Sequence, residues 1–190
     1  MEKTEKEKML AGEIYDCGDP ELQARWHLAK RLTLQYNQAD TRDREYLDGI
    51  LEKLLGSRGK NVWIAPPFYV DYGENIHIGE GCEINMNCVF LDCNAIIIGN
   101  YSGIGPNVQI YAVTHPVIPE ERLSGKGHFW KSSTAPVVIG DNVWIGGGTI
   151  ILAGVTIGSG TTVAAGSVVT RSLPERCLAA GTPCKVIRYL

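Results

Sequence analysis

Residues 139–169 read IGDNVWIGGGTIILAGVTIGSGTTVAAGSVV, and an aliphatic side chain returns at every sixth position of this stretch. A period of six matches neither the 3.6-residue repeat of a helix nor the two-residue alternation of a single strand. It is typical of a parallel β-helix, in which each hexapeptide forms one side of a triangular coil and stacked coils bury a shared apolar column. The inward positions are Ile139, Ile145, Ile151, Ile157, Val163 and Val169.

The same spacing extends toward the N-terminus, with two-residue offsets between sets. The earlier sets are Ile64, Val70 and Ile76, then Ile78, Ile84 and Phe90, then Ile98, Ile104 and Ile110. A solenoid tolerates such offsets as insertions at a corner. We therefore predict coils from about residue 60 to about residue 112 that resume at about residue 136. Ordinary strands joined by glycine turns are the alternative, and the unbroken register of residues 139–169 argues against them.

Residues 1–58 carry helix signals instead of the repeat. Thr4 to Glu7 has the form of a capping box and predicts a short first helix. Asp19, followed by proline and glutamate, predicts the start of a second helix, and Asp40 or Thr41 predicts that of a third. The third helix would carry an apolar stripe of Tyr46, Leu47, Ile50, Leu51, Leu54 and Leu55. We expect this segment to cover the end of the β-helix, either as a cap alone or also as one wall of a site.

Composition restricts the class of protein. The formal net charge is −3 and glycine accounts for 22 of the 190 residues, which suits a turn-rich coil and provides no basic field for nucleic acid or a membrane surface. The first residues lack the apolar run of a signal peptide or a membrane span. None of the six cysteines forms a Cys-x-x-Cys pair. Cys82 and Cys88 occupy repeat positions, so we predict core thiols in a reduced, cytoplasmic protein.

One segment interrupts the predicted coils of residues 59–190. Thr114-His115-Pro116 opens a polar stretch that lacks the repeat, and we treat residues 115–135 as a protruding loop. A loop of this length on a compact solenoid is usually functional. His115 stands at its base and is the candidate general base, because imidazole keeps a neutral fraction near pH 7 that can accept a hydroxyl proton.

Several longer motifs accompany the repeat. They are EKMLAGEIY (7–15), DYGENI (71–76), Thr-His-Pro (114–116), IGDNVWIGG (139–147), AGVTIG (153–158), AGSVVT (165–170) and AGTPCKVI (180–187). With these motifs the chain resembles, nearly end to end, the hexapeptide class of sugar O-acetyltransferases, which includes the maltose, galactoside and nodulation acetyltransferases. The repeat alone identifies only a fold, whereas the opening motif combined with Thr-His-Pro is far more specific.

The resemblance implies a left-handed parallel β-helix, a homotrimer with active sites between subunits, and acetyl transfer from acetyl-CoA to a sugar hydroxyl without a metal. His115 matches the catalytic base, and Asn85 matches the residue that orients the acceptor hydroxyl. Asp16 and Asp71 fall at acceptor-binding positions. The residues at CoA-contact positions are Gly105, Gly147, Ala165, Thr170, Arg171, Lys185 and Arg188.

The residue chemistry favours direct transfer, because no serine or cysteine nucleophile beside a second base is evident. The N–H of Gly147 is the candidate donor to the oxyanion. Arg171, Lys185 and Arg188 can neutralise phosphates of CoA. An ordinary solvated basic tail is the alternative for these three cations.

Two departures from the family leave the acceptor open. Cys93 stands next to Asp92 where the galactoside enzyme has a second acid, and Asp71 replaces a serine. The loop is also longer, and its residues 128–130 (His, Phe, Trp) either contact an acceptor or adenine ring or pack on a neighbouring subunit.

Other classes remain possible at this point. An antibiotic-inactivating acetyltransferase shares the fold and the cofactor, a metal-dependent hydratase would need three converging histidines, and a non-catalytic solenoid would need no site.

Overall fold

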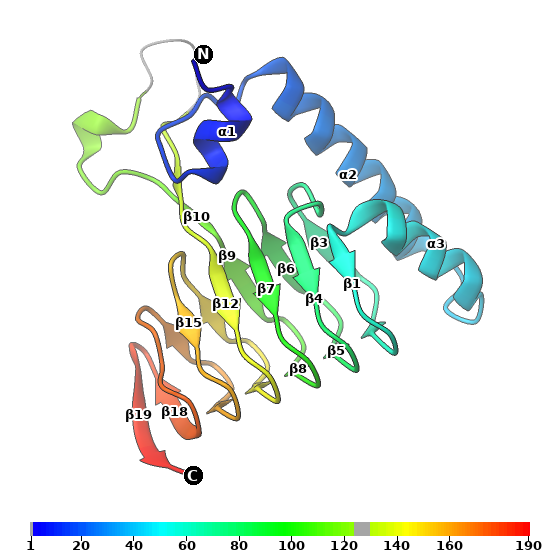
Figure 1. The fold of residues 1–190 in the computed structure, drawn as a ribbon, viewed down its shortest axis with the longest axis vertical. Coiled ribbons are helices and arrows are strands. Elements are labelled where there is room, and N and C mark those ends of the chain that lie inside the picture. Colours follow the sequence, from blue (N-terminus) through cyan, green and yellow to red (C-terminus); the bar gives the residue numbers. More distant parts are fainter. Residues whose placement is uncertain (1, 124–129) are drawn as a thin grey trace.

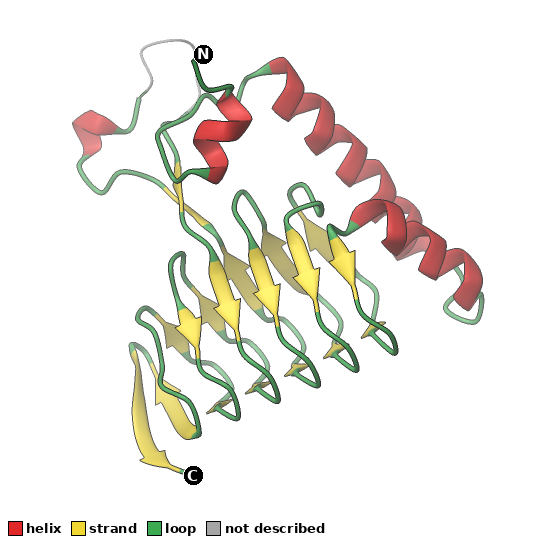
Figure 2. Ribbon diagram, in the orientation of Figure 1, coloured by secondary structure: helices red, strands yellow, loops and turns green. Residues whose placement is uncertain are grey.

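The computed structural model describes residues 2–123 and 130–190, so the predicted contacts of His128 and Phe129 lie outside the described residues. N-terminal helices are followed by a left-handed parallel β-solenoid (Figure 1, Figure 2). This architecture confirms the fold predicted from the repeat. The helices are α1 (Glu5–Leu10), α2 (Pro20–Gln38) and α3 (Arg44–Leu54), and a 3-10 turn, η1 (Pro119–Glu121), lies in the protruding loop.

The described strands of the solenoid form a triangular prism, and each coil passes through a first, a second and a third face. The first face contains β1 (Ser57–Arg58), β4 (Ile76–Ile78), β7 (Ile96–Ile98), β12 (Val137–Ile139) and β15 (Thr156–Ile157). The second contains β2 (Trp63–Ile64), β5 (Glu83–Ile84), β8 (Gly103–Ile104), β13 (Trp144–Ile145), β16 (Thr162–Val163), β18 (Cys177–Gly181) and β19 (Cys184–Tyr189). The third contains β3 (Phe68–Val70), β6 (Cys88–Leu91), β9 (Gln109–Tyr111), β14 (Ile150–Ile151) and β17 (Val168–Val169).

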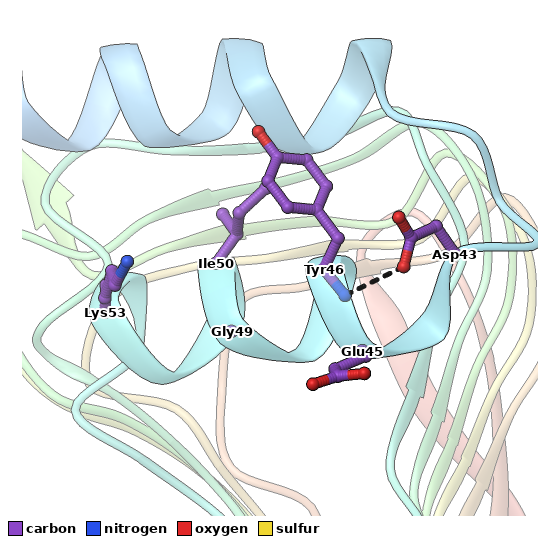
Figure 3. Close-up of a pocket in the computed structure, with 6 residues that line it drawn as sticks. All are labelled: Asp43, Glu45, Tyr46, Gly49, Ile50 and Lys53. Atoms are coloured by element: carbon purple, nitrogen blue, oxygen red, sulfur yellow. Dashed lines mark hydrogen bonds between the residues drawn. The ribbon is translucent and has the colours of Figure 1, made fainter.

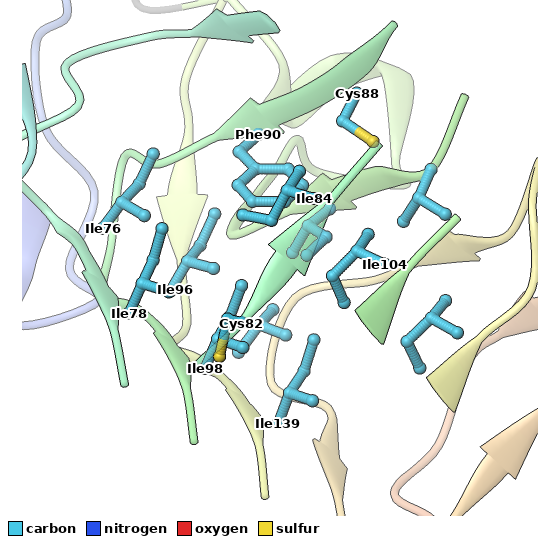
Figure 4. Close-up of a cluster of buried hydrophobic side chains, with 14 of the residues drawn as sticks. Ile76, Ile78, Cys82, Ile84, Cys88, Phe90, Ile96, Ile98, Ile104 and Ile139 are labelled. Carbon is cyan, nitrogen blue, oxygen red and sulfur yellow. The ribbon is translucent and has the colours of Figure 1, made fainter. Parts of the chain in front are cut away.

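The six-residue repeat builds the core directly. On the second face Ile84, Ile104 and Ile145 are neighbours in register, so each inward side chain stacks on the one below (Figure 4). All six aliphatic positions of residues 139–169 are 0–1% exposed. Cys82 and Cys88 are buried in the same column, as predicted, and their thiols donate to backbone carbonyls of the next coil.

The early coils are longer than the late ones at a single corner, between the third and the first face. Between inward residues that are equivalent in register, three residues (152–154) lie at this corner in a late coil, whereas five (71–75 and 91–95) lie there in the two earliest coils. The difference, five residues against three, is the two-residue insertion that the sequence predicted. The protruding loop leaves the solenoid at the same corner. We call residues 71–75, residues 91–95 and this loop the inserted corner.

The helices close the first end of the apolar column. Buried residues of α2 and α3, including Tyr36, Leu51 and Leu54, belong to the same core cluster as the coils. The Tyr36 hydroxyl donates to the Ile64 carbonyl (2.6 Å), which fixes α2 on the first coil. The helices of residues 1–58 therefore cap the column. Residues of the same segment also line a cavity at the inserted corner.

Two details of the third helix differ from the prediction. Its N-cap is Asp43, whose carboxylate accepts from the Tyr46 N–H (3.1 Å). Asp40 instead pairs with the Arg42 guanidinium (2.6 Å) in the preceding turn, so its carboxylate is not available as a cap. Tyr46, predicted in the buried stripe, is 50% exposed.

The C-terminal end differs from the coils. The antiparallel hairpin of β18 and β19 completes the second face, with β18 adding to β16 in parallel. Among the described residues, no helix has the length and apolar character needed to cross a membrane.

Candidate active site

His115 follows β10 (Val113–Thr114), which pairs with β11 (Ser133–Thr134) at the base of the loop. Its Nδ1 lies 2.9 Å from the Lys131 carbonyl oxygen and 3.4 Å from the Ser132 hydroxyl oxygen. A carbonyl oxygen can only accept a hydrogen bond, so Nδ1 carries the proton when the ring is neutral. The exposed Nε2 is then the unprotonated nitrogen, which is the form a general base requires.

The N-terminal segment binds to the base of the same loop. Tyr15 forms a β-bridge with Ser132, and the Thr134 hydroxyl donates to the Met9 carbonyl. These contacts bring Asp16, the residue after Tyr15, beside the loop that carries His115. The Asp16 carboxylate accepts from the Gly18 N–H (2.9 Å), and its second oxygen has no protein partner among the described residues.

Asp71 projects from the inserted corner and is held by three side chains. The Trp26 indole N–H lies 3.2 Å and the Lys30 ammonium 3.3 Å from Oδ1, while the Cys93 thiol lies 3.6 Å from Oδ2. Burial raises the pKa of the Cys93 thiol, with a further contribution from the Asp71 charge, so the thiol stays protonated and can donate. Asp71 lines a cavity of about 340 Å³ together with Cys17, Gln23, Trp26 and Tyr72.

Trp26 and Lys30 were not among the predicted site residues. Trp26 lies on the helical face that the sequence assigned to packing, and its apolar body does pack against the cluster around Tyr15 and Tyr72. Only the indole N–H faces Asp71. A helical pattern cannot separate packing by the ring from hydrogen bonding by the indole N–H. The available signal was the four-residue spacing from Trp26 to Lys30, which places both side chains on one face of the helix.

Glu74 ties α1 and α2 to the inserted corner. Its carboxylate lies 2.8 Å from the Lys6 ammonium of α1 and 2.6 Å from the Arg25 guanidinium of α2. Because Asp71 is three residues earlier in the same corner, this clamp sets the distance between the helices and the cavity.

Asp92 shapes the corner from inside. Its fully buried carboxylate accepts the backbone N–H groups of Asp71 (3.0 Å), Tyr72 (2.8 Å) and Asn75 (3.3 Å). Burial raises the pKa of Asp92 to about 6, although the backbone donors act in the opposite direction. From the sequence, Asp92 was recognised only as the neighbour of Cys93. Its position shows that it holds the backbone from which Asp71 projects.

This raised pKa predicts a pH dependence of stability. The folded pKa of about 6 exceeds the ordinary carboxyl value of 3.8, so the folded state binds the proton more tightly. The contribution of Asp92 to the free energy of unfolding should therefore fall as the pH rises from about 4 to about 6, and should be constant above that. Denaturant unfolding of wild type and Asp92→Asn between pH 4 and 7 measures this difference. A difference that does not change with pH would contradict a raised pKa.

A second set of predicted residues lies on another edge of the prism, between the second and third faces. Asn85, Gly105, Gly147 and Ala165 follow β5, β8, β13 and β16, and we call this row the Asn85 edge. A Cβ built on Gly105 would come within 2.6 Å of the Gly147 nitrogen, so the turns stack with no room for a side chain there. A groove of about 260 Å³ runs along this edge and is lined by Glu83, Asn85, Gly103, Ile104, Gly105 and Trp144.

Trp144 is the residue in this groove that the sequence reasoning missed as a site residue. Its side chain points outward from β13 and is 62% exposed, next to Gly103 of the neighbouring strand. The tryptophan stood inside a quoted motif, but the six-residue repeat identifies inward positions only. An outward tryptophan facing an outward glycine was the available signal.

The remaining CoA-side residues lie near the C-terminal end. Thr170 and Arg171 follow β17, while Lys185 and Arg188 are on β19, and all four side chains are exposed. Arg171, Lys185 and Arg188 take part in none of the ion pairs found within the described residues. Their charges are therefore available to an anionic ligand.

Apart from the four residues near the C-terminal end, the predicted residues divide into two groups within one chain. His115, Asp16 and Asp71 lie at the inserted corner, whereas Asn85, Gly105, Gly147 and Ala165 lie on the Asn85 edge. The third face separates these two edges, with β10 at the upper side of the prism and β5 and β8 at the lower side in Figure 1. A single chain does not bring His115 and Asn85 together.

Another cavity, of about 410 Å³, lies on α3 and has no link to these residues. It is lined by Asp43, Glu45, Tyr46, Gly49, Ile50 and Lys53 (Figure 3). Asp43 is the helix cap, as its hydrogen bond to the Tyr46 backbone shows. No cluster of His, Cys, Asp and Glu side chains suited to a metal ion occurs in the described part of the chain.

Comparisons with known proteins agree with this architecture. Residues 8–59 match the maltose acetyltransferase hexapeptide capping motif, and residues 136–171 match the bacterial transferase hexapeptide model. Nodulation protein L of Rhizobium meliloti is 47% identical over 186 residues, which cover 98% of this chain and 99% of the relative. The chain belongs to the hexapeptide-repeat acetyltransferase family.

Two solved acetyltransferases extend the likeness to three dimensions. A maltose O-acetyltransferase from Clostridium difficile 630 superposes with a TM-score of 0.94 at 43% identity, covering 99% of this chain and 98% of the other. A hexapeptide-repeat acetyltransferase from Vibrio cholerae O1 biovar eltor, complexed with acetyl-CoA, gives 0.91 at 39% identity, covering 99% of both chains. This hexapeptide-repeat protein is therefore an acetyltransferase that uses acetyl-CoA, which confirms the activity class and cofactor predicted from the motifs.

Proposed function

We propose that this enzyme transfers acetyl from acetyl-CoA directly to a hydroxyl group of a sugar, with His115 as the general base. The observation that carries the proposal is the hydrogen bond between His115 Nδ1 and the Lys131 carbonyl. It selects the tautomer with a free Nε2. That nitrogen accepts the hydroxyl proton as the acceptor oxygen attacks the thioester carbon, and the sulfur of CoA leaves.

The cavity at the inserted corner suits a polyhydroxylated ring. The carboxylates of Asp71 and Asp16 accept hydrogen bonds from hydroxyl groups, and both are fixed by protein donors. Trp26 and Tyr72 supply aromatic surface on which the apolar face of a sugar ring packs. We therefore assign acceptor binding to this corner, which makes residues 1–58 a wall of the site as well as a cap of residues 59–190.

Direct transfer is favoured over an acetylated enzyme. A nucleophilic thiol needs a lowered pKa, whereas burial and the charge of Asp16 raise the pKa of Cys17, the thiol that lines the cavity. The Gly147 N–H, on the Asn85 edge, is assigned to the oxyanion of the tetrahedral intermediate, where one donor is worth about 3 kcal/mol.

Acetyl-CoA is assigned to the Asn85 edge and the C-terminal cations. The closely stacked turns at Gly105 and Gly147 have no room for a side chain, so none projects there beside the groove, and Trp144 borders it. Arg171, Lys185 and Arg188 would bind the phosphates of CoA, since none of them has a carboxylate partner among the described residues.

A homotrimer would unite the two edges. The outward residues of the third face are in register and mostly apolar, and we call Tyr69, Val89, Gln109, Ile150 and Val168 the outer ladder. Such a surface is suited to a second copy of the chain. Closed threefold assembly would place the inserted corner of one subunit against the Asn85 edge of the next and form three equivalent sites.

The six free thiols support a reducing compartment such as the cytoplasm.

The proposed activity is tested by thiol release from acetyl-CoA with a panel of hexoses, galactosides, maltose and amino sugars, and with aminoglycoside and chloramphenicol-like acceptors. Sugar-dependent release supports the proposal, and release confined to the antibiotics would overturn it.

A further inference from the structure

The returning strand of the protruding loop encloses the His115 ring on two sides. The Trp130 ring meets the imidazole edge to face, with centroids 5.3 Å apart and an interplanar angle of 85°. The next residue, Lys131, provides the carbonyl that accepts from Nδ1. Two consecutive residues therefore define both the tilt of the imidazole and its tautomer.

Arg122 links this returning strand to the outgoing one. Its Nε donates to the Pro116 carbonyl (2.9 Å) and its Nη2 to the Val117 carbonyl (2.8 Å), directly after His115. Its guanidinium lies 5.6 Å from the centre of the Trp130 ring. Its own carbonyl accepts from the Lys131 N–H (2.6 Å). Arg122 thus bonds through its side chain to the segment that leaves His115, and through its backbone carbonyl to the segment that returns beside it.

We propose that Arg122 and Trp130 are positioning residues for His115, an inference that rests on the proposed role of His115 as general base. His115 is exposed and its loop is long, so neither core packing nor the solenoid backbone restricts its ring. A long loop also loses more entropy on ordering than a tight turn does. The Arg122 hydrogen bonds close the loop at its base, and the Trp130 ring blocks rotation of the imidazole.

The Trp130 ring has an aromatic contact with His115 and lies over the Arg122 guanidinium, and Trp130 is not among the residues that line the cavity beside Asp71. A role in positioning therefore explains its place better than a role in sugar stacking. The two roles differ in kinetics, because a positioning residue changes kcat, whereas a residue that contacts the acceptor changes its KM.

The test is a double-mutant cycle on the full-length enzyme. Arg122→Met keeps the length of the side chain and removes its hydrogen bonds, and it should lower kcat about tenfold while the KM values for sugar and acetyl-CoA stay within about twofold. In the His115→Ala background the same substitution should have no further effect, because it acts through the imidazole. Trp130→Phe should keep most of the kcat that Trp130→Ala loses. Arg42→Met, on an arginine whose ion pair within the described residues is with Asp40, is the matched control and should leave activity unchanged.

The possible outcomes distinguish the positioning role of Arg122 and Trp130 from the general-base role of His115. Equal losses from Arg122→Met in both backgrounds, at an unchanged melting temperature, would show a role independent of His115 and overturn the positioning proposal. A rise in sugar KM at constant kcat would also overturn it, in favour of acceptor contact. Normal turnover of His115→Ala would instead remove the general base and with it the proposed function.

Discussion

His115→Ala is expected to lower kcat by about 100-fold or more, because general-base assistance typically contributes 10² to 10⁴ in rate. The acceptor hydroxyl would then lose its proton to water in the transition state. The KM for acetyl-CoA should change little, since the residues assigned to CoA lie on the Asn85 edge and the C-terminal strand. Steady-state thiol release at saturating sugar measures both constants.

His77→Ala is the matched control. His77 is a half-buried histidine on β4, and its Nδ1 lies 2.9 Å from the Ser57 hydroxyl oxygen on the first face, outside both groups of site residues. Its activity should equal that of wild type. Turnover near the wild-type rate in folded His115→Ala protein would exclude His115 as the base, and loss of activity in both variants would point to general damage to the solenoid.

The core could be predicted from sequence because a β-helix uses one simple rule. Ile145 and Val163 are buried since every sixth side chain points inward. Because the coils stack in register, the same period also predicts which inward side chains are neighbours. The position of the insertions also followed, because any departure from six must occur at a corner. The cap of α3 did not follow: Asp40 and Asp43 are equally good caps by type, but α3 begins at Arg44, so Asp43 is the cap and Asp40 pairs with Arg42 in the preceding turn.

The site was less accessible to sequence reasoning. Motifs indicated His115 and Asn85, but their chemistry depends on partners that no period predicts, such as the Lys131 carbonyl, sixteen residues away in the chain. Trp26 was missed because packing and binding place the same demand on an aromatic side chain, and Trp144 because the six-residue repeat identifies inward positions only. Asp92 was undervalued because its function is to hold backbone N–H groups, a role visible only when the corner is folded.

The separation of His115 from Asn85 leads to a test of the shared site. Neither His115→Ala nor Asn85→Ala enzyme should be active above a few percent of wild type, because both residues are proposed to act on the same acceptor hydroxyl. Co-expression of the two variants with different affinity tags, followed by tandem purification, would isolate the proposed trimers in mixed form, with both kinds of subunit.

Geometry sets the expected activity of these mixed trimers. If each site takes His115 from one subunit and Asn85 from the next around the ring, every mixed trimer contains one junction at which both residues are intact. Its activity should therefore recover to about one third of wild type, whichever variant is in the majority. Light scattering should find a trimer in the same samples, and an active monomer of 20.8 kDa would contradict the shared site.

The control pairs His115→Ala with Asp71→Asn. Both residues lie at the inserted corner of the same chain, and Tyr15 links the two regions through its bridge to Ser132 and its packing against Cys93 and Tyr72. No junction in these mixed trimers restores a complete site, so their activity should stay at the weighted mean of the two parents. Recovery in the first mixture and none in the second would assign His115 and Asp71 to one subunit and Asn85 to its neighbour. A first mixture no more active than its parents would place each site within a single chain.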